Sequence, residues 1–254
     1  MADDLTLALE LADLADAITL PRWRTAELRV ATKPDLTPVS DADTAAEAAM
    51  RRRLAAARPG DAVIGEEEGP VGAAAAERRW ILDPIDGTRS YVRGLPVFAT
   101  LIALEVAGRI EVGVVSAPAL RRRWWSARGR GALADGAPIH VSRVARIEDA
   151  FVSTTDPRAY ADERRRRAHD ALVRRCWTSR ALGDFWSHVL VAEGGVDVAI
   201  EPGAAPWDLA PLLVIVEEAG GRLTDLDGRA RIDAGAAVTT NGLLHDEVLA
   251  ALRA

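Results

Sequence analysis

The sequence has few of the features that support a disulfide, a membrane span or secretion. Cys176 is the only cysteine, so no disulfide can form within the chain, and this favours a reducing compartment. No apolar run reaches the roughly eighteen residues that a membrane-spanning helix needs. The start, MADDLTLALE, lacks the basic and apolar segments of a signal peptide. We therefore expect a cytoplasmic protein.

Concentrated positive charge is also absent. The 32 Lys and Arg residues are outnumbered by 38 Asp and Glu residues, and the formal net charge is -6. Lys33 is the only lysine, and the arginine runs at 51–53, 121–123 and 164–167 are short. Nucleic acids and anionic membranes both require dense positive charge, so we expect neither as a partner. A hydrophobic content of 49% is enough for a core in one large or two smaller domains.

The first part of the chain shows helical patterns and then strand patterns. Leu7, Leu11, Leu14 and Ile18 recur at helical spacing and predict an amphipathic helix. A second helix is predicted from Asp41 or Asp43 to about residue 58. Strands are predicted at 62–64, 80–82, 98–105, 110–116 and 122–127. Because short turns separate several of these strands, we expect a mostly antiparallel sheet.

From about residue 150, strands and helices alternate. Helices are predicted at about 159–174, 184–193, 208–219 and from 243, with strands at 150–154, 196–200, 222–224 and 236–239. Such alternation favours an α/β arrangement. We therefore predict an α+β half with an antiparallel sheet that binds metal, 1–145, and a smaller α/β half that completes the active site, 146–254.

Pairs of carboxylates follow two of the predicted strands. Glu66 and Glu67 come directly after the strand at 62–64, and Asp83 and Asp86 come after the strand at 80–82. Isolated acidic residues are usually solvated surface charge. At the end of a strand and beside glycine or proline, however, they lie at a sheet edge, where loops form binding sites.

The sequence DPIDGT contains both of these aspartates in a turn restrained by proline. The turn can bring the carboxylates of Asp83 and Asp86 and the carbonyl of Ile85 to one point. Magnesium prefers such oxygen ligands. Gly87 allows a ligand to approach the backbone, and Thr88 can begin a short helix whose free N–H groups face a phosphate. A metal and backbone amides arranged in this way suit a phosphate monoester.

These residues resemble the inositol-monophosphatase-like, lithium-sensitive phosphatase superfamily. Three motifs match in order: GEE at 65–67, WILDPIDGT at 80–88 and PWD at 206–208. The second motif is highly specific, and the resemblance covers roughly residues 30 to 228. It implies a layered αβαβα sandwich of the inositol-monophosphatase/fructose-bisphosphatase type, inhibition by lithium and a homodimer.

The resemblance also implies a metal centre with two or three Mg²⁺ ions. Glu66, Asp83 and the Ile85 carbonyl would hold one ion, and Asp83, Asp86 and Asp208 would hold a second. Two such cations can stabilise the attacking and leaving oxygens of a phosphoryl transfer. No protein nucleophile or phosphoenzyme is expected.

Further roles are implied for the residues around the reacting water. Thr88 and Glu66 would orient and deprotonate the water, and Asp41 would hydrogen-bond Thr88. The amides of Gly87 and Thr88 would bind the phosphate. Ser90 and Tyr91 depart from the asparagine and phenylalanine of many relatives, as does Pro211 from a small residue, and these changes affect local substrate contacts.

Several segments look most like the histidinol-phosphate phosphatase branch of this superfamily: VRGLPV at 92–97, RRWWSARG at 122–129, GDF at 183–185 and TNGLLH at 240–245. That substrate carries a protonated amine and an imidazole, which acidic groups such as Asp184 and Glu201 would suit. Arginine pairs well with phosphate. The predicted substrate-binding residues are Asp86, Gly87, Thr88, Arg89, Arg180, Asp184, Glu201 and Asp208.

Other functions stay open at this point. An inositol-1-phosphate phosphatase of broad specificity is the nearest alternative. A sugar bisphosphatase or nucleotide 3′-phosphatase is disfavoured because no second basic cluster is apparent. A non-catalytic ligand-binding homologue would be expected to lack at least one of the metal-binding residues, and all are present. The expected partner is a small phosphorylated metabolite.

Overall fold

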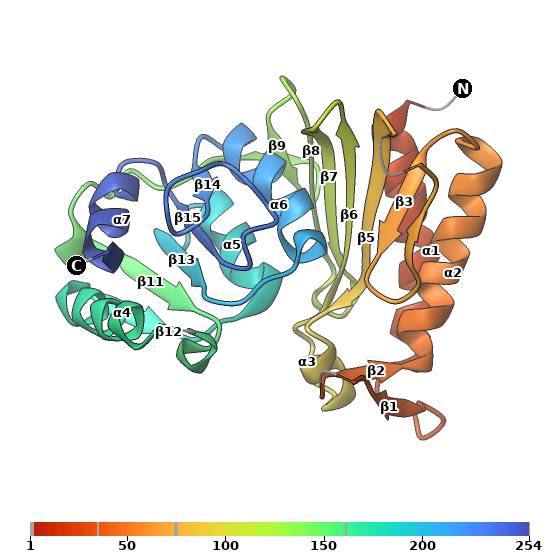
Figure 1. The fold of residues 1–254 in the computed structure, drawn as a ribbon, viewed down its shortest axis with the longest axis horizontal. Helices are drawn as coiled ribbons and strands as arrows, with labels where there is room; N and C mark the ends of the chain where they lie inside the picture. Colours follow the sequence, from red (N-terminus) through yellow and green to blue (C-terminus); the bar gives the residue numbers. More distant parts are fainter. Residues whose placement is uncertain (1–2, 35, 74–75, 161, 254) are drawn as a thin grey trace.

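The computed structural model describes residues 3–34, 36–73, 76–160 and 162–253. Five layers lie side by side in Figure 1, in the order helices, sheet, helices, sheet, helices. The helices of the outer and middle layers are α1 (Asp4–Arg22), α2 (Asp41–Ala57), α4 (Glu163–Arg175), α5 (Asp184–Ala192), α6 (Pro206–Glu218) and α7 (His245–Arg253). The predicted αβαβα sandwich of the α+β class is therefore confirmed.

The larger sheet has eight strands in the order β10-β9-β8-β7-β6-β5-β3-β4. All neighbours are antiparallel except β3 and β5, which are parallel. The strands are β3 (Ala62–Gly65), β4 (Gly69–Val71), β5 (Arg78–Asp86), β6 (Ala99–Val106), β7 (Arg109–Ala117), β8 (Arg122–Ala127), β9 (Ala132–Ala134) and β10 (Ala137–Ile139). Because β3 and β5 run in the same direction, their carboxyl ends meet at one edge.

The smaller sheet has five strands in the order β12-β11-β13-β15-β14, with parallel and antiparallel neighbours. Its strands are β11 (Phe151–Thr154), β12 (Thr178–Arg180), β13 (Val198–Glu201), β14 (Arg222–Thr224) and β15 (Ala237–Thr240). The remaining elements are the hairpin β1 (Val30–Thr32) and β2 (Pro38–Ser40), the short helix α3 (Thr88–Val92), and the 3-10 turns η1 (Pro118–Leu120), η2 (Ile147–Asp149) and η3 (Pro157–Ala159).

Helix α6 lies between the two sheets, and its apolar sequence explains why it can be buried there. Every residue from Leu209 to Val216 is buried, as expected for a helix that is apolar on all sides. Gly113 in β7 allows the helix to approach closely, because a Cβ there would lie 2.5 Å from the Pro211 carbonyl oxygen. This packing fixes the beginning of α6 against the larger sheet.

Several sequence predictions differ from the structure in detail. Leu14, predicted on the buried stripe of the first helix, is 38% exposed, and alanines such as Ala8 are buried instead, because α1 packs closely on α2 and β7. The helix predicted from about residue 159 begins at Glu163, because η3 precedes it and the Asp162 side chain caps its first turn. No helix in the described ranges is long and apolar enough to cross a membrane.

Candidate active site

Three aspartates from two elements meet between the halves of the molecule. Asp83, Asp86 and Asp208 each offer a carboxylate oxygen, and these oxygens lie within 4.8 Å of one another. Asp83 and Asp86 lie at the carboxyl end of β5, where the pairing with β6 shifts register. Asp208 lies in the first turn of α6. The arrangement supplies the hard oxygen ligands that Mg²⁺ binds, so these residues fit a divalent metal.

Hydrogen bonds fix the backbone turn that carries this cluster. The Ile85 amide donates to Asp83 Oδ1 at 2.9 Å, and Thr88 Oγ1 donates to the Ile85 carbonyl at 2.9 Å. Gly87 has a φ of 80°, and a Cβ there would lie 2.9 Å from the Val97 carbonyl oxygen, so only glycine fits without strain. Thr88 begins α3, as predicted.

The cluster holds mutually repelling charges away from water. Burial raises the pKa of Asp83 well above its usual value, and the neighbouring carboxylates of Glu66, Asp86 and Asp208 raise it further. Burial also raises the pKa of Asp86 well above its usual value, and the carboxylates of Asp184 and Asp208 raise it further. Burial also raises the pKa of Asp208 to about 7, with Glu66 and Asp184 contributing. A bound cation would relieve this repulsion.

A lysine from the β1–β2 hairpin is bound to the acidic pair that follows β3. Lys33 Nζ lies 2.7 Å from Glu66 Oε1 and 2.7 Å from Glu67 Oε1. Burial raises the pKa of Glu67 to about 7 even though Lys33 opposes this. Sequence reasoning assigned Lys33 no role; the signal that could have found it is its place as the only lysine in an arginine-rich chain.

The predicted hydrogen bond between Asp41 and Thr88 is wrong. Asp41 Oδ1 accepts from the Arg29 amide at 3.2 Å, while the Thr88 hydroxyl donates to the Ile85 carbonyl. Asp41 lines a separate depression on the surface. The cause is helical geometry, because Asp41 is the first residue of α2 and faces away from the cluster.

Asp43, two residues later, points inward instead. Its Oδ2 accepts from the amide and hydroxyl of Ser40 at 2.8 and 2.5 Å, completing a capping box. Its Oδ1 is buried without a hydrogen-bond partner among the described residues. Burial raises the pKa of Asp43 to about 6, and Glu66 adds to this effect. The S-x-x-D spacing of the capping box was the available signal for its orientation.

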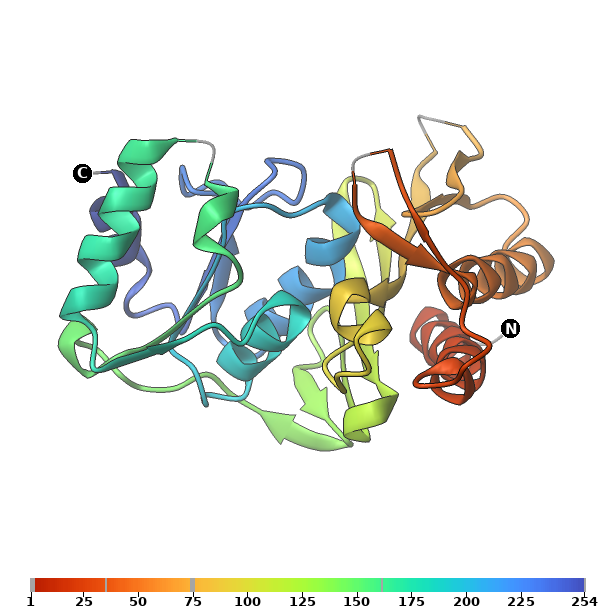
Figure 2. The ribbon, with the colours of Figure 1, turned by 90° about the horizontal axis from the view of Figure 1, so that it is seen from below.

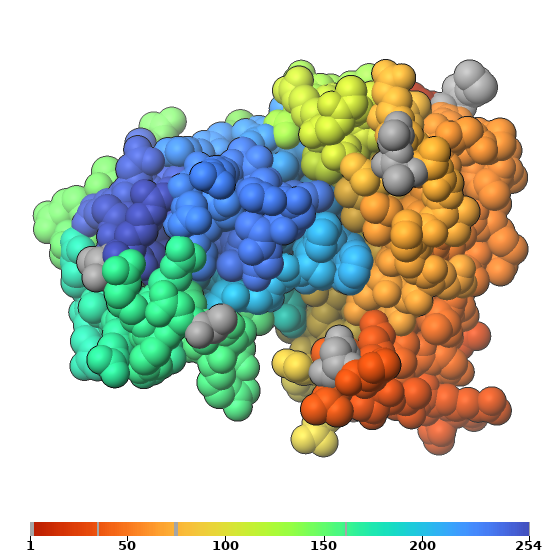
Figure 3. Space-filling model, in the orientation of Figure 1, coloured from red at the N-terminus to blue at the C-terminus, as the bar shows by residue number. Residues whose placement is uncertain are grey.

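Two adjoining cavities open beside the carboxylates. The smaller, about 240 Å³, is lined by Glu66, Asp83 and the 85–89 segment. The larger, about 780 Å³, extends from Asp86 and Asp208 towards η3 and β13. In Figure 3 the surface is hollowed between the green lobe that contains η3 and the yellow and orange segments of α3 and the hairpin. Figure 2 shows α3 and the beginning of α6 side by side on this face.

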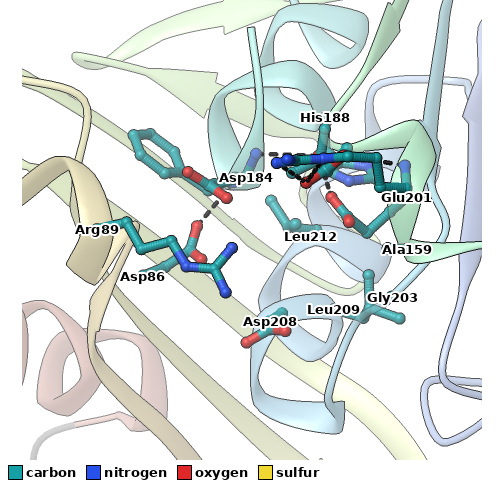
Figure 4. A pocket seen from close by; sticks show the side chains of 14 residues that line it. Asp86, Arg89, Ala159, Asp184, His188, Glu201, Gly203, Asp208, Leu209 and Leu212 are labelled. Carbon is teal, nitrogen blue, oxygen red and sulfur yellow. Dashed lines mark hydrogen bonds and ion pairs between the residues drawn. The ribbon is translucent and has the colours of Figure 1, made fainter. Parts of the chain in front are cut away.

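The far wall of the larger cavity is acidic. Glu201, from the end of β13, is 7% exposed and accepts a hydrogen bond from Thr155 Oγ1. Burial raises the pKa of Glu201 to about 8, and Asp184 and Asp208 raise it further. Burial also raises the pKa of Asp184, against the effect of Arg89. Figure 4 shows Asp86, Arg89 and Asp184 on one side of the cavity and Glu201 on the other.

The arginines around the site take different positions. Arg89 lines both cavities, as expected for a substrate-binding residue. Arg180 does not: it is exposed at the end of β12, where its Nη1 donates to Thr178 Oγ1 and the Ser179 carbonyl. The structure therefore does not place Arg180 with the other predicted site residues. Arg158, which sequence reasoning missed, lines the larger cavity and pairs with Asp156 at 2.8 Å.

His188 forms part of the wall of the larger cavity. Its Nδ1 lies 2.7 Å from Thr239 Oγ1, and burial lowers its pKa to about 4. The imidazole is therefore neutral at physiological pH, and with so low a pKa it is a weak base, which agrees with a structural role.

Comparisons with known proteins agree on one family. The model of the Inositol monophosphatase family matches residues 2–254. A histidinol-phosphatase from Mycobacterium tuberculosis is 55% identical, with 99% of this chain and 98% of the relative covered. One from Streptomyces coelicolor is 48% identical, with 97% and 96% covered. The solved structure of an inositol monophosphatase from Zymomonas mobilis is 33% identical, with a TM-score of 0.88 and 99% and 98% covered.

Proposed function

Because the chain belongs to the inositol monophosphatase family, we propose that it is a magnesium-dependent phosphate monoester hydrolase whose substrate is histidinol phosphate. The near-complete coverage of relatives named histidinol-phosphatase supports this ester over inositol phosphate. The single structural observation that carries the proposal is a cavity with a metal-binding carboxylate cluster and Asp184 on one side and the buried carboxylate of Glu201 on the other.

Two or three magnesium ions would be held by Glu66, Asp83, Asp86, Asp208 and the carbonyl of Ile85. When bound, they would supply Lewis-acid stabilisation of the phosphoryl group and lower the pKa of a water molecule. The donor set supports this assignment, because three of these carboxylates already lie within 4.8 Å of one another and have raised pKa values without a cation.

Thr88 and Glu66 would position and deprotonate the attacking water. The Thr88 hydroxyl donates a hydrogen bond to the Ile85 carbonyl, so its oxygen is left to accept a hydrogen bond from water. Glu66 lines the same small cavity and can take the second proton. The water oxygen then forms the new bond to phosphorus as the ester bond breaks, and the leaving alkoxide takes up a proton from solvent to depart as the alcohol. The amides of Gly87 and Thr88, together with Arg89, would bind the phosphate.

Glu201 and Asp184 would bind the amine of histidinol phosphate. Glu201 is buried and Asp184 is half-buried, both have raised pKa values, and no cationic side chain of the described residues lies within ion-pair distance of either. A protonated amine placed there would restore the ionised form of these carboxylates and gain a charge-assisted hydrogen bond. An uncharged inositol ring offers no such compensation.

The direct test is hydrolysis of histidinol phosphate and inositol 1-phosphate with magnesium by the purified protein. We expect kcat/KM to be at least about tenfold higher for histidinol phosphate, the difference that one buried charge-assisted contact supplies. Equal or faster turnover of inositol phosphate would refute the substrate assignment. Failure to hydrolyse either ester would refute the phosphatase proposal itself.

The Glu201→Gln variant separates recognition of the amine from catalysis. It keeps the shape of the side chain and removes its charge, so KM for histidinol phosphate should rise about tenfold or more while kcat/KM for inositol 1-phosphate changes little. Glu193→Gln is the matched control outside both cavities; Glu193 directly follows α5, and its Oε1 accepts a hydrogen bond from Trp124 Nε1. It should leave the ratio between the two esters unchanged.

A further inference from the structure

A third cavity, of about 530 Å³, lies between the larger sheet and the later part of the chain. It shares no lining residue with the two cavities of the candidate active site. Its walls come from β3, β5, the β6–β7 turn, α6 and the loop at 230–233. Figure 3 shows the blue later residues meeting the yellow and orange first half along this side of the molecule. A volume of this size is typical of a small-molecule site.

The floor of this cavity is apolar. Ile81, Ile110 and Leu213 line it and are 3%, 4% and 8% exposed, and Ile232 lines it from the later loop. These side chains come from both halves of the molecule, so a ligand seated on them would contact the larger sheet and α6 together. Such a surface favours a ligand with an apolar body.

The rim is charged and carries an excess of arginine. Four arginines line the cavity, Arg79, Arg109, Arg128 and Arg231, together with only three carboxylates, Glu105, Glu217 and Asp233. Each carboxylate is already bound to one of the arginines: Glu105 to Arg79, Glu217 to Arg128 and Asp233 to Arg231. The fourth guanidinium therefore has no counterpart in the cavity.

That guanidinium belongs to Arg109. Among the described residues, the one carboxylate within 4.0 Å of it is that of Glu111, at 3.6 Å from Nε, which is beyond hydrogen-bond distance, and the Arg109 side chain is 66% exposed. Arg109 thus keeps its N–H donors for an anionic group at the mouth of the cavity. A planar guanidinium binds carboxylate, phosphate and sulfonate groups well.

The cavity also borders the segments that carry the proposed metal ligands. Ile64, Ile81 and Pro206 line it, and each lies two residues before one of those ligands, Glu66, Asp83 and Asp208 respectively. In β5 this spacing places Ile81 and Asp83 on the same face of the sheet. A ligand in this cavity would contact β3 and β5 on one side and α6 on the other. The proposed magnesium ligands come from the same two sides, Glu66 and Asp83 from the strands and Asp208 from α6.

We propose that this cavity is a second ligand site, for a small organic anion with an apolar body, and that its occupancy is coupled to magnesium binding. The acidic group of the ligand binds Arg109, and the apolar body rests on the isoleucine and leucine floor. Coupling between two sites is reciprocal, so the ligand changes magnesium affinity by the same factor as magnesium changes ligand affinity.

The probe for the test is 8-anilinonaphthalene-1-sulfonate, which joins one sulfonate to an aromatic body and fluoresces when bound. We expect saturable binding of one probe per chain. N-phenyl-1-naphthylamine has the same body without the sulfonate, and we expect it to bind at least about tenfold more weakly. Equal binding of the two compounds would overturn the assignment of an anion site.

Variants locate the probe. Arg109→Gln should weaken binding about tenfold, and Ile232→Asp should also weaken it. Arg146→Gln is the matched control, because Arg146 is 71% exposed with its nearest carboxylate oxygens at 3.7 and 3.8 Å, yet lies outside this cavity. Equal effects of Arg109→Gln and Arg146→Gln on probe binding would overturn the placement of the probe in this cavity. So would displacement of the probe by inorganic phosphate with saturating magnesium, which places it in the active site.

The coupling is measured by calorimetric titration of magnesium with and without saturating probe, without any substrate. We expect the magnesium Kd of the wild type to change at least about twofold with probe bound, and the Kd of Arg109→Gln to stay constant at the same probe concentration. An unchanged Kd in the wild type would overturn the coupling. This readout does not depend on which phosphate ester the enzyme hydrolyses.

Discussion

Replacing Asp208 by asparagine should stabilise the metal-free protein at alkaline pH while abolishing its activity. Asp208 is half-buried, and its Oδ2 accepts a hydrogen bond from the Ala205 amide at 2.7 Å. Asparagine keeps that acceptor through its own side-chain oxygen, so the first turn of α6 stays capped. What the substitution removes is a negative charge that faces Glu66 and Asp184.

The magnitude follows from the pKa. In the folded protein, burial and the neighbouring carboxylates raise the pKa of Asp208 from 3.8 to about 7. The folded state therefore binds more protons than the unfolded state between these values, so its stability falls as pH rises from about 4 to about 7. A shift of about 3 units corresponds to about 4 kcal/mol. Because a buried amide also pays a desolvation cost, we expect Asp208→Asn to gain on the order of 2–4 kcal/mol at pH 8.

The assay is urea unfolding in EDTA at pH 8 and pH 4. The variant should have the higher free energy of unfolding at pH 8, and the two proteins should agree within about 1 kcal/mol at pH 4. Asp225→Asn is the control, because Asp225 is 5% exposed and its Oδ1 accepts two backbone amides away from the cluster. It should give no gain. A wild type as stable as Asp208→Asn at pH 8 would refute the argument from repulsion.

Three further predictions concern catalysis. Asp86→Asn keeps an acceptor for the Phe185 amide, so the chain should still fold. Its kcat should nevertheless fall at least about a thousandfold, and calorimetry should show weaker magnesium binding. A near-normal rate would exclude Asp86 as a metal ligand. Asp41→Asn should keep kcat/KM within about threefold of the wild type, because the Asp41 carboxylate binds the Arg29 amide. A large loss of kcat/KM would instead show that Asp41 contributes to catalysis. Lithium at roughly tens of millimolar should inhibit turnover in steady-state assays, and indifference would contradict the behaviour that the family resemblance implies.

The fold was largely predictable because its elements have strong local signals. Strand β8 was predicted with its observed limits, and the buried α6 was placed within two residues of its start. The short edge strands β4, β10 and β12 were missed, whereas β14, which is equally short, was predicted directly after the glycine pair that follows α6. The division of the chain at about residue 145 stays a prediction, as do the homodimer and the cytoplasmic location.

The site was predictable where its residues lie in rigid local motifs and not where tertiary packing decides. Asp83, Asp86 and Thr88 belong to one turn, so their convergence follows from the DPIDGT sequence itself. Asp41 and Asp43 lie two residues apart at the start of one helix. The S-x-x-D spacing indicates that Asp43 caps the helix, but the packing of α2 on the larger sheet decides which of the two faces inward. Lys33 lies 33 residues from Glu66, a pairing that no local pattern encodes.

The apolar core and the acidic site depend on each other through α6. The carboxylate of Asp208 is held near that of Asp83, although Asp208 raises the pKa of the buried Asp83 and is itself repelled by Glu66 and Asp184. Such repulsion would separate two flexible loops, but Asp208 is fixed by the Ala205 amide at the start of a helix packed on both sides. The free energy of burying that helix offsets the repulsion until a cation binds. Shortening a buried side chain of α6, as in Leu212→Ala, should therefore weaken magnesium binding as well as stability, and a variant less stable but with unchanged magnesium affinity would separate the two.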